Sequence, residues 1–254
     1  MSAVDRLAPL LTVPVPAPSG EAWLDLVNGR PGSRGRVQDF WESGGGARVY
    51  DLVLATGDRV RQRLPRFAAG GLVRDFYAVD RRLDLVGGET VLDLACGQGT
   101  HTRRLADAVG PSGLVVGADL SPPMLDRAAR AVRADNTVLV RADAMDPPLR
   151  DDTVDAVSCS LCLHLVPDLD TALAQIARVL KPGGRLAVAV PGQGPGPTRV
   201  VIELLGRAAQ MRVFGRGELA DALVRHGFVR VRTLWESVMH IVDAVAPGAA
   251  PPRG

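Results

Sequence analysis

Two aspartates and two glycines stand where consecutive strand-like segments end. Asp93 lies in the stretch VLDLACGQGT, which contains Gly97 and Gly99, and Asp119 lies in GADLSPPML, 20 residues after Gly99. Glycines let a backbone approach a ligand closely, and the helix after such a turn offers unpaired N–H groups, here from Thr100 onward, that suit a carboxylate or phosphate. An acid at the offset of Asp119 is placed to hydrogen-bond both hydroxyls of a ribose. These residues predict a ligand with an anionic head and a ribose.

A third aspartate, Asp143, follows in RADAMDPPL at the end of the next strand-like segment. It could accept a hydrogen bond from an adenine amino group, beside the backbone of Ala144, although a turn before two prolines would also explain it. NAD would use similar features, but its fingerprint needs a small residue three positions after Gly99, where this chain has Thr102. We therefore expect an adenine nucleoside ligand that is not a dinucleotide.

The segments that must position these residues alternate between short strand-like runs and longer amphipathic runs. Strands are expected at 90–95, 114–119, 137–143, 154–160, 185–190, 229–235 and 237–245, with helices over 100–109, 121–134 and 169–180, the last ending at the turn KPGG. This alternation indicates a mainly parallel sheet covered on both faces. The last two strands are too close for a crossover and should pair antiparallel. The predicted fold class is α/β, a Rossmann-like doubly wound sheet of seven strands, mostly parallel, with an antiparallel C-terminal strand.

Other segments are expected to flank or extend this domain, which spans 47–245. Residues 1–46 are interpreted as a partly flexible extension in which EAWLDLV and VQDFW could be short helices. Residues 47–85 carry apolar side chains at helical spacing and predict a helical cap. Residues 192–216 are expected to form an insert on the substrate side, and 246–254 a disordered tail.

Composition limits the class of protein and its partners. Lys and Arg total 30 against 28 for Asp and Glu, a net charge of +2 that gives no reason to expect nucleic acid or an anionic membrane as partner. The sequence shows no leader and no apolar run of about 18 residues, so we expect a cytoplasmic protein without membrane insertion. Cys159 and Cys162 are three residues apart on an expected strand and should point to opposite faces, which favours buried packing and no metal. The oligomeric state stays open.

The chain resembles class I S-adenosylmethionine-dependent methyltransferases in five stretches, VLDLACGQGT, GADLSPPML, RADAMDPPL, DDTVDAVSCSLCLHLVPD and ARVLKPGGRLAVAVPG, within about residues 47–245. Within that family it looks most like ubiquinone and menaquinone C-methyltransferases and small-molecule enzymes of secondary metabolism. The resemblance implies S-adenosyl-L-methionine as cofactor. It implies cofactor-binding roles for Asp93, Ala95, Gly97, Gly99 and Thr100 at the methionine end, Asp119 at the ribose, Leu120 and Met124 on the adenine, Asp143 and Ala144 at its edge, and the Cys159 carbonyl at the amino group. Ala95 replaces the family's commoner first glycine.

The implied reaction is methyl transfer to a small, apolar or aromatic metabolite. Such a transfer needs alignment, desolvation and, for some acceptors, removal of one proton. His164, just past the fourth expected strand, is the candidate base, because an imidazole has an ordinary pKa of about 6.5. The candidate substrate-binding residues are Tyr50, Phe76, Tyr77, Met211 and Phe214, although ordinary core packing would explain each aromatic equally well. The competing hypothesis is a scaffold or regulatory protein that binds the same cofactor without transferring methyl.

Overall fold

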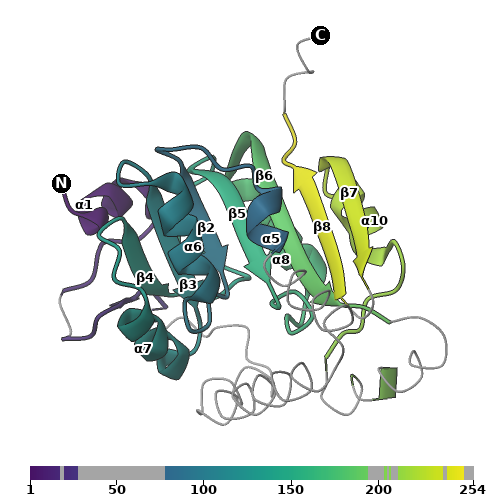
Figure 1. Cartoon of the computed structure of the whole chain (residues 1–254), viewed down its shortest axis with the longest axis horizontal. Helices are drawn as coiled ribbons and strands as arrows, with labels where there is room; N and C mark the ends of the chain where they lie inside the picture. Colours follow the sequence, from purple (N-terminus) through teal and green to yellow (C-terminus); the bar gives the residue numbers. More distant parts are fainter. Residues whose placement is uncertain are drawn as a thin grey trace, which may run out of the picture.

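The computed structural model describes residues 1–17, 20–27, 78–193, 203–204, 206, 211–236 and 239–248. Within these residues the chain forms one eight-stranded sheet with the order β1-β4-β3-β2-β5-β6-β8-β7 (Figure 1). The strands are β1 Leu24–Asp25, β2 Thr90–Leu94, β3 Leu114–Asp119, β4 Thr137–Arg141, β5 Val154–Ser160, β6 Leu180–Pro191, β7 Val229–Glu236 and β8 Met239–Val245. The strand order reverses direction at β2, which places a topological switch point between β2 and β5.

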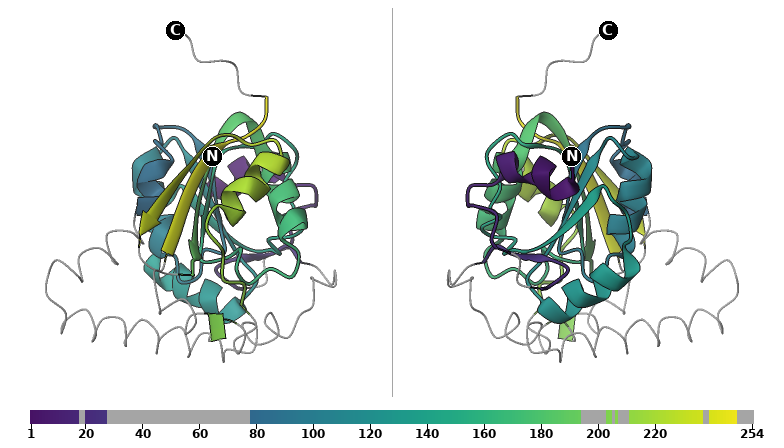
Figure 2. Two further views of the ribbon diagram at one scale, coloured as in Figure 1. Left: turned by 90° about the vertical axis from the view of Figure 1, so that its right-hand side faces the viewer. Right: turned by 90° about the vertical axis from the view of Figure 1, so that its left-hand side faces the viewer.

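Helices cover both faces of this sheet, as Figure 2 shows from the two sides. The helices are α1 Ala3–Leu7, α5 Ala78–Arg82, α6 Thr100–Val109, α7 Pro122–Ala131, α8 Leu169–Val179 and α10 Glu218–Arg225, with a short 3-10 turn at Ala8–Leu10. One core cluster joins Leu7 of α1, Leu173 of α8 and Leu223 of α10, and a second joins Val79 of α5 to Leu105 of α6. No described helix has the length and apolar content needed to cross a membrane.

The expected doubly wound α/β fold is confirmed. The pairs of β2, β3, β4, β5 and β6 are parallel, whereas β8 runs antiparallel to both β6 and β7. Figure 1 shows the consequence: the parallel strands point to the lower edge and β8 points the other way. The carboxyl ends of β2, β3, β4 and β5 therefore meet at one edge, where ligands bind in such sheets.

The stretch EAWLDLV is not helical, which corrects the sequence expectation and adds the eighth strand. Leu24 and Asp25 of this stretch form β1, paired parallel with Val140 and Arg141 at the edge of the sheet. A side-chain bond from Trp23 Nε1 to Asp126 Oδ1 (3.0 Å) fixes the approach to this strand. Pairing with an open sheet edge overrides the local helical preference, because β4 would otherwise expose unpaired backbone groups.

Two further boundaries differ from expectation. The KPGG stretch belongs to β6, which begins at Leu180, because the register with β5 shifts between Val154 and Ala156 and accommodates the extra residues as a bulge. The extension before the sheet begins with α1, where Leu7 and Leu11 are buried and Ser2 and Asp5 form a capping box. Four predicted segments lie wholly or partly outside the described residues: VQDFW, most of the expected 47–85 cap, residues 194–202, 205 and 207–210 of the expected insert, and 249–254 of the expected tail.

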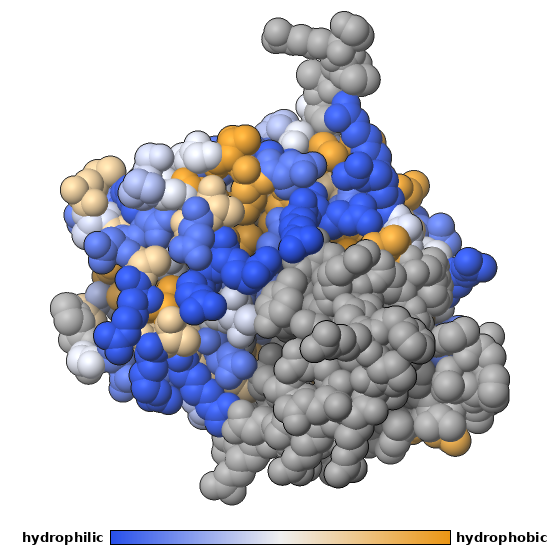
Figure 3. Space-filling view, in the orientation of Figure 1, coloured by the Kyte–Doolittle hydropathy of each residue, from blue (hydrophilic) through white to orange (hydrophobic). Residues whose placement is uncertain are grey.

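The face that carries α5, α6 and α7 is mainly hydrophilic in its described part, with small apolar areas between the helices (Figure 3). Amphipathic helices that cover a sheet turn their apolar stripe inward and leave polar side chains outside. The sheet topology, rather than this surface, indicates the carboxyl edge as the place for the functional residues.

Candidate active site

The glycine turn between β2 and α6 has three residues in the left-handed region. Ala95, Gly97 and Gly99 have φ angles of 59°, 54° and 82°. A Cβ added at Gly99 would lie 2.5 Å from Cγ2 of Val132, whereas one added at Gly97 would meet nothing within 4 Å. Gly99 is therefore required by close packing against the end of α7, and Gly97 leaves open space beside its backbone where a ligand can approach.

Asp119 at the end of β3 is joined to this turn. Its Oδ2 accepts a hydrogen bond from the backbone N–H of Gly97 at 2.8 Å, and its Oδ1 accepts one from Ser121 at 2.9 Å. Burial raises the pKa of Asp119, and the backbone N–H donors, including those of Ser121 and Gly97, partly offset that effect. Each carboxylate oxygen has further lone pairs, so both can still accept a hydrogen bond from a ligand hydroxyl.

Asp93 lies beneath the turn rather than at its surface. Only 1% of the residue is exposed, and its Oδ2 accepts a hydrogen bond of 2.6 Å from Thr102 Oγ1. Burial raises its pKa to about 6, against the lowering effect of the His101 charge and the Thr102 hydroxyl. Asp93 therefore acts on the site through Thr102, by fixing the first turn of α6 against β2.

A buried ion cluster on α5 and α6 lies beside Asp93, and the sequence reasoning missed it. Asp80 accepts from Arg104 Nε at 2.6 Å through one oxygen, and its other oxygen lies 2.6 Å from Nδ1 of His101. Burial lowers the pKa of His101, but the bond to Asp80 and the charge of Asp93 outweigh it and raise the pKa overall. His101, in the first turn of α6, is thus held by Asp80 of α5.

The third acid, Asp143, follows β4 at the same edge. It is 8% exposed, and its Oδ1 accepts a hydrogen bond of 2.9 Å from the backbone N–H of Met145. Its neighbour Ala144 is half-buried, as is Leu120 after β3, while Met124 in the first turn of α7 is buried. The structure thus brings the residues expected to contact the ribose and the adenine to the ends of two adjacent strands.

At the end of β5 the chain leaves the strand through Leu161, which has a φ angle of 56°. This bend brings Cys159 and Cys162 together in the core, so the expectation that they face opposite sides is wrong. A hydrogen bond that the Cys159 thiol donates to the Cys162 sulfur, together with burial, raises the pKa of Cys159. Both cysteines are free and buried, and the packing role predicted for them agrees with this environment.

His164 lies in the turn after β5 and is 7% exposed. Burial lowers its pKa to about 4, so the imidazole is neutral at neutral pH. Its Nδ1 has no hydrogen-bond partner among the described residues, and its backbone oxygen accepts from the N–H of Arg212 at 2.9 Å. This bond fastens the His164 turn to the segment that carries two of the expected substrate-binding residues.

Those two residues occupy different environments. Met211 is half-buried, whereas Phe214 is fully buried in the main core and its backbone N–H donates to the Pro191 oxygen at 3.1 Å. Core packing therefore explains Phe214 in the structure. Tyr50, Phe76 and Tyr77 lie outside the described residues.

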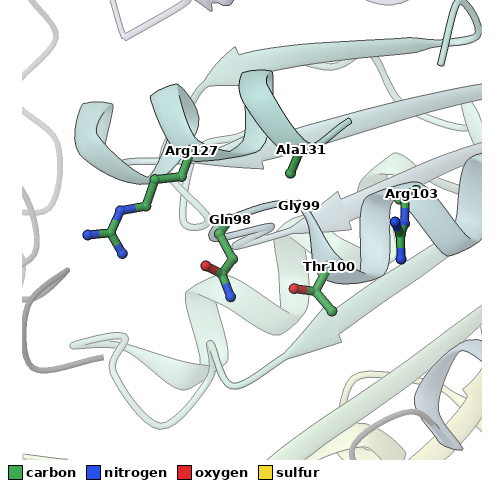
Figure 4. Close-up of a pocket in the computed structure, with 6 residues that line it drawn as sticks. All are labelled: Gln98, Gly99, Thr100, Arg103, Arg127 and Ala131. Atoms are coloured by element: carbon green, nitrogen blue, oxygen red, sulfur yellow. The ribbon is translucent and has the colours of Figure 1, made fainter. Parts of the chain in front are cut away.

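A hollow of about 270 Å³ opens on the outer side of the glycine turn (Figure 4). The residues that line it are Gln98, Gly99, Thr100, Arg103, Arg127 and Ala131. It joins the turn to α7, and its two arginines add positive charge beside the start of α6. Gly99 and Thr100, two of the residues expected at the methionine end of the cofactor, line this hollow, whereas none of the three strand-end aspartates does.

Comparisons with known proteins match the same part of the chain. A family model described as a methyltransferase domain matches residues 92–188. The chain is 36% identical over 195 residues to nocamycin O-methyltransferase of Saccharothrix syringae, which covers 65% of this chain and 70% of that protein. It is 40% identical over 163 residues to demethylmenaquinone methyltransferase of Lactobacillus johnsonii, which covers 61% of this chain and 64% of that protein.

The fold also matches a solved structure with bound ligands. Phosphoethanolamine N-methyltransferase 2 of Haemonchus contortus, in complex with phosphomonomethylethanolamine and S-adenosylhomocysteine, superposes with a TM-score of 0.61 at 18% identity, over 68% of this chain and 52% of that one. At this identity the likeness shows the fold alone. The sequence relatives and the shared fold together show that the chain belongs to the class I S-adenosylmethionine-dependent methyltransferases, a family that uses S-adenosylmethionine as methyl donor.

Proposed function

We propose that this protein transfers a methyl group from S-adenosylmethionine to a small, apolar or aromatic metabolite. The observation that carries the proposal is the arrangement of Asp119, Gly97 and His164 at one carboxyl edge of the sheet. Gly97 follows β2 and Asp119 ends the adjacent strand β3, and both would hold the cofactor. His164 follows β5, which pairs with β2 on its other side. The same edge would therefore serve both the methyl donor and its acceptor.

The described residues fit the cofactor. Asp119 can accept from two ribose hydroxyls because its two oxygens offer about four lone pairs, more than the backbone N–H groups of Gly97, Leu120 and Ser121 use. Gly97 has no atom within 4 Å of its missing side chain, which leaves room for a methionine head beside the turn. The backbone N–H groups at the start of α6 suit that head's carboxylate. Asp143 and Ala144 would meet the adenine edge, with Leu120 and Met124 against its face.

The chain's own contribution to the reaction is alignment, exclusion of water and proton removal. Bound S-adenosylmethionine supplies a methyl group on a sulfonium sulfur, which needs no further activation. The acceptor atom forms a bond to the methyl carbon while the carbon–sulfur bond breaks and its electron pair stays on sulfur. When the acceptor is a hydroxyl, the proton that it loses goes to His164, which is neutral at neutral pH because burial lowers its pKa to about 4. A pKa this low makes the imidazole a weak base, so the negative charge that develops on the acceptor oxygen must favour its protonation.

Two features favour a small molecule over a macromolecule. The net charge of +2 gives no general reason to expect a polyanion such as tRNA as the acceptor. The relatives are named for demethylmenaquinone and for O-methylation of nocamycin, which are both small molecules. These names support the class of acceptor but leave carbon, oxygen and nitrogen as alternative methylation sites.

The test is methyl transfer by the full chain with tritiated S-adenosylmethionine, offered in parallel a small-molecule extract, total tRNA and a protein extract. We expect label in organic-soluble products and none in the macromolecular fractions. Asp119→Ala should lower transfer at least tenfold at cofactor concentrations below saturation, and Asp107→Ala, which removes an exposed carboxylate on α6, should leave it unchanged. Label only in tRNA or protein would reject the acceptor class. Cofactor binding without any transfer would instead support the scaffold hypothesis.

A further inference from the structure

Two buried polar atoms without a hydrogen-bond partner among the described residues lie on one short segment. They are Oγ of Ser160, at the end of β5, and Nδ1 of His164, in the turn that follows. The hydroxyl of Ser158 on the same strand differs from them, because it interacts with the Asp93 carboxylate. A buried donor or acceptor left unpaired costs roughly 1–3 kcal/mol, so such atoms are rare and call for an explanation. Two of them within five residues at the carboxyl edge of the sheet point to a ligand that they would meet.

The register of the sheet places Ser160 beside the glycine turn. Ser158 pairs with Asp93 of β2, so the two side chains share the face that α5 and α6 cover. Ser160 lies two residues farther toward the carboxyl edge and therefore points to the same face. On its other side it pairs with Ala189 of β6, whose methyl group offers no hydrogen bond. Ser160 is thus the last polar side chain of β5 before the chain leaves the strand.

Ser160 is also held at the rim rather than deep in the core. It is 8% exposed, whereas Ser158 is fully buried against Asp93. The next residue, Leu161, adopts a positive φ of 56°, a conformation that costs a leucine roughly 1–2 kcal/mol. Local strain of this kind is typical of functional sites. No bond to another described residue fixes the Ser160 hydroxyl, so rotation about χ1 can turn it toward a ligand at the edge.

We propose that Ser160 is an acceptor-binding residue whose hydroxyl donates a hydrogen bond to an oxygen on the methyl acceptor. The inference rests on the proposed function and deepens it by assigning the acceptor a polar oxygen on an otherwise apolar molecule. The cofactor's amino group is expected at the backbone of Cys159, whose side chain lies on the opposite face of the strand. The methyl acceptor, rather than the cofactor, is thus the molecule that the Ser160 side chain can contact.

The bond would also help the reaction of a hydroxylated acceptor. As the O–H bond of the acceptor breaks and its proton moves to a base, negative charge builds on the acceptor oxygen. A hydrogen bond from Ser160 stabilises that charge more than it stabilises the neutral hydroxyl, because charge-assisted bonds are stronger. Ser160 keeps its own proton throughout, so the balance of the transfer is unchanged.

The experiment measures binding of 1-naphthol and of naphthalene to the full chain saturated with S-adenosylhomocysteine. The two probes share an apolar ring system and differ in one hydroxyl. The intact protein should prefer 1-naphthol by about threefold to tenfold, as one neutral hydrogen bond provides. Ser160→Ala should lose that preference while its affinities for naphthalene and for S-adenosylhomocysteine stay unchanged.

Thr137→Ala is the matched control. Its Oγ1 is likewise buried without a partner among the described residues, but it lies at the first residue of β4, at the opposite edge of the sheet. This variant should keep the preference for 1-naphthol. A preference that survives Ser160→Ala, a loss of cofactor affinity in that variant, or binding of neither probe by the intact protein would each overturn the inference. Tritium transfer by the intact protein in the same preparation tells these results apart from failure of the proposed function.

Discussion

The backbone N–H of Gly97 donates a hydrogen bond of 2.8 Å to the carboxylate of Asp119. The acid proposed to bind the ribose thus also holds the glycine turn against the end of the neighbouring strand. Two parts of the cofactor site that are 22 residues apart in the chain are organised by one side chain. Loss of Asp119 should therefore disturb both the ribose contact and the turn that receives the methionine head.

The two glycines of the turn should respond differently to alanine. Gly99→Ala adds a Cβ 2.5 Å from Val132 at a φ of 82°, and we expect it to lower the free energy of unfolding by about 2–4 kcal/mol. Gly97→Ala meets no atom and should cost only about 1–2 kcal/mol of backbone strain. Urea unfolding of both variants checks this order. Equal losses would contradict the packing role assigned to Gly99.

Ala95 offers the reverse experiment. It has a φ of 59° at the position where the family more often has glycine. Ala95→Gly removes roughly 1 kcal/mol of strain and adds a similar loss of chain entropy, so the free energy of unfolding should change by less than about 0.5 kcal/mol. Ala118→Gly, in a buried strand, should destabilise by about 1 kcal/mol or more. Thermal unfolding compares them, and a loss at Ala95 as large as that at Ala118 would argue against strain in the turn.

The buried pair of Asp80 and His101 predicts a large effect of a single truncation. Asp80→Ala leaves His101 and Arg104 without their shared carboxylate, and removal of one partner from a buried ion pair costs about 3–5 kcal/mol. Asp107→Ala removes an exposed carboxylate from α6, the helix of His101 and Arg104, and should be nearly neutral. Chemical denaturation gives both values. A small loss for Asp80→Ala would mean that the cluster contributes little to holding α5 on α6.

Asp93 should make the protein more stable as the pH falls from 7 to 4. Its pKa is about 6 in the folded protein, above its ordinary value, so the folded state takes up a proton before the unfolded state does. By linkage this contribution is present at low pH and is lost as the pH rises through 6, a difference of about 3 kcal/mol. Asp93→Asn should therefore lose more stability than the parent protein on acidification, as unfolding curves at several pH values would reveal.

His164 should change the free energy of unfolding with pH in the direction opposite to Asp93. Its folded pKa of about 4 lies below the ordinary value, so the unfolded state binds the proton first and stability is lost as the pH falls from 6.5 to 4. His164→Gln should retain more stability on acidification than the parent protein. Identical pH profiles for this variant and Asp93→Asn would contradict both pKa assignments.

The sequence predicted the alternation of strands and helices and the strand-end acids, because hydrophobic period and glycine turns are local signals. It did not predict β1, since Leu24 and Asp25 become a strand only by pairing with β4. It also missed the bond between Asp80 and His101, because the spacing of apolar residues within α5 and within α6 does not show that these two helices pack together. The bend at Leu161 that brings Cys159 and Cys162 together could not be predicted either, because leucine rarely adopts a positive φ and its presence does not indicate one.

The most direct test of the account is calorimetric binding of S-adenosylhomocysteine and of NAD to the intact chain and to Asp119→Ala, with Asp107→Ala as control. We predict that the intact chain binds S-adenosylhomocysteine and prefers it to NAD. Asp119→Ala should weaken that binding at least tenfold, about 1.4 kcal/mol, and Asp107→Ala should leave it unchanged. Tighter binding of NAD, or an affinity for S-adenosylhomocysteine that is insensitive to the loss of the Asp119 carboxylate, would contradict the assignment of this edge of the sheet as the cofactor site.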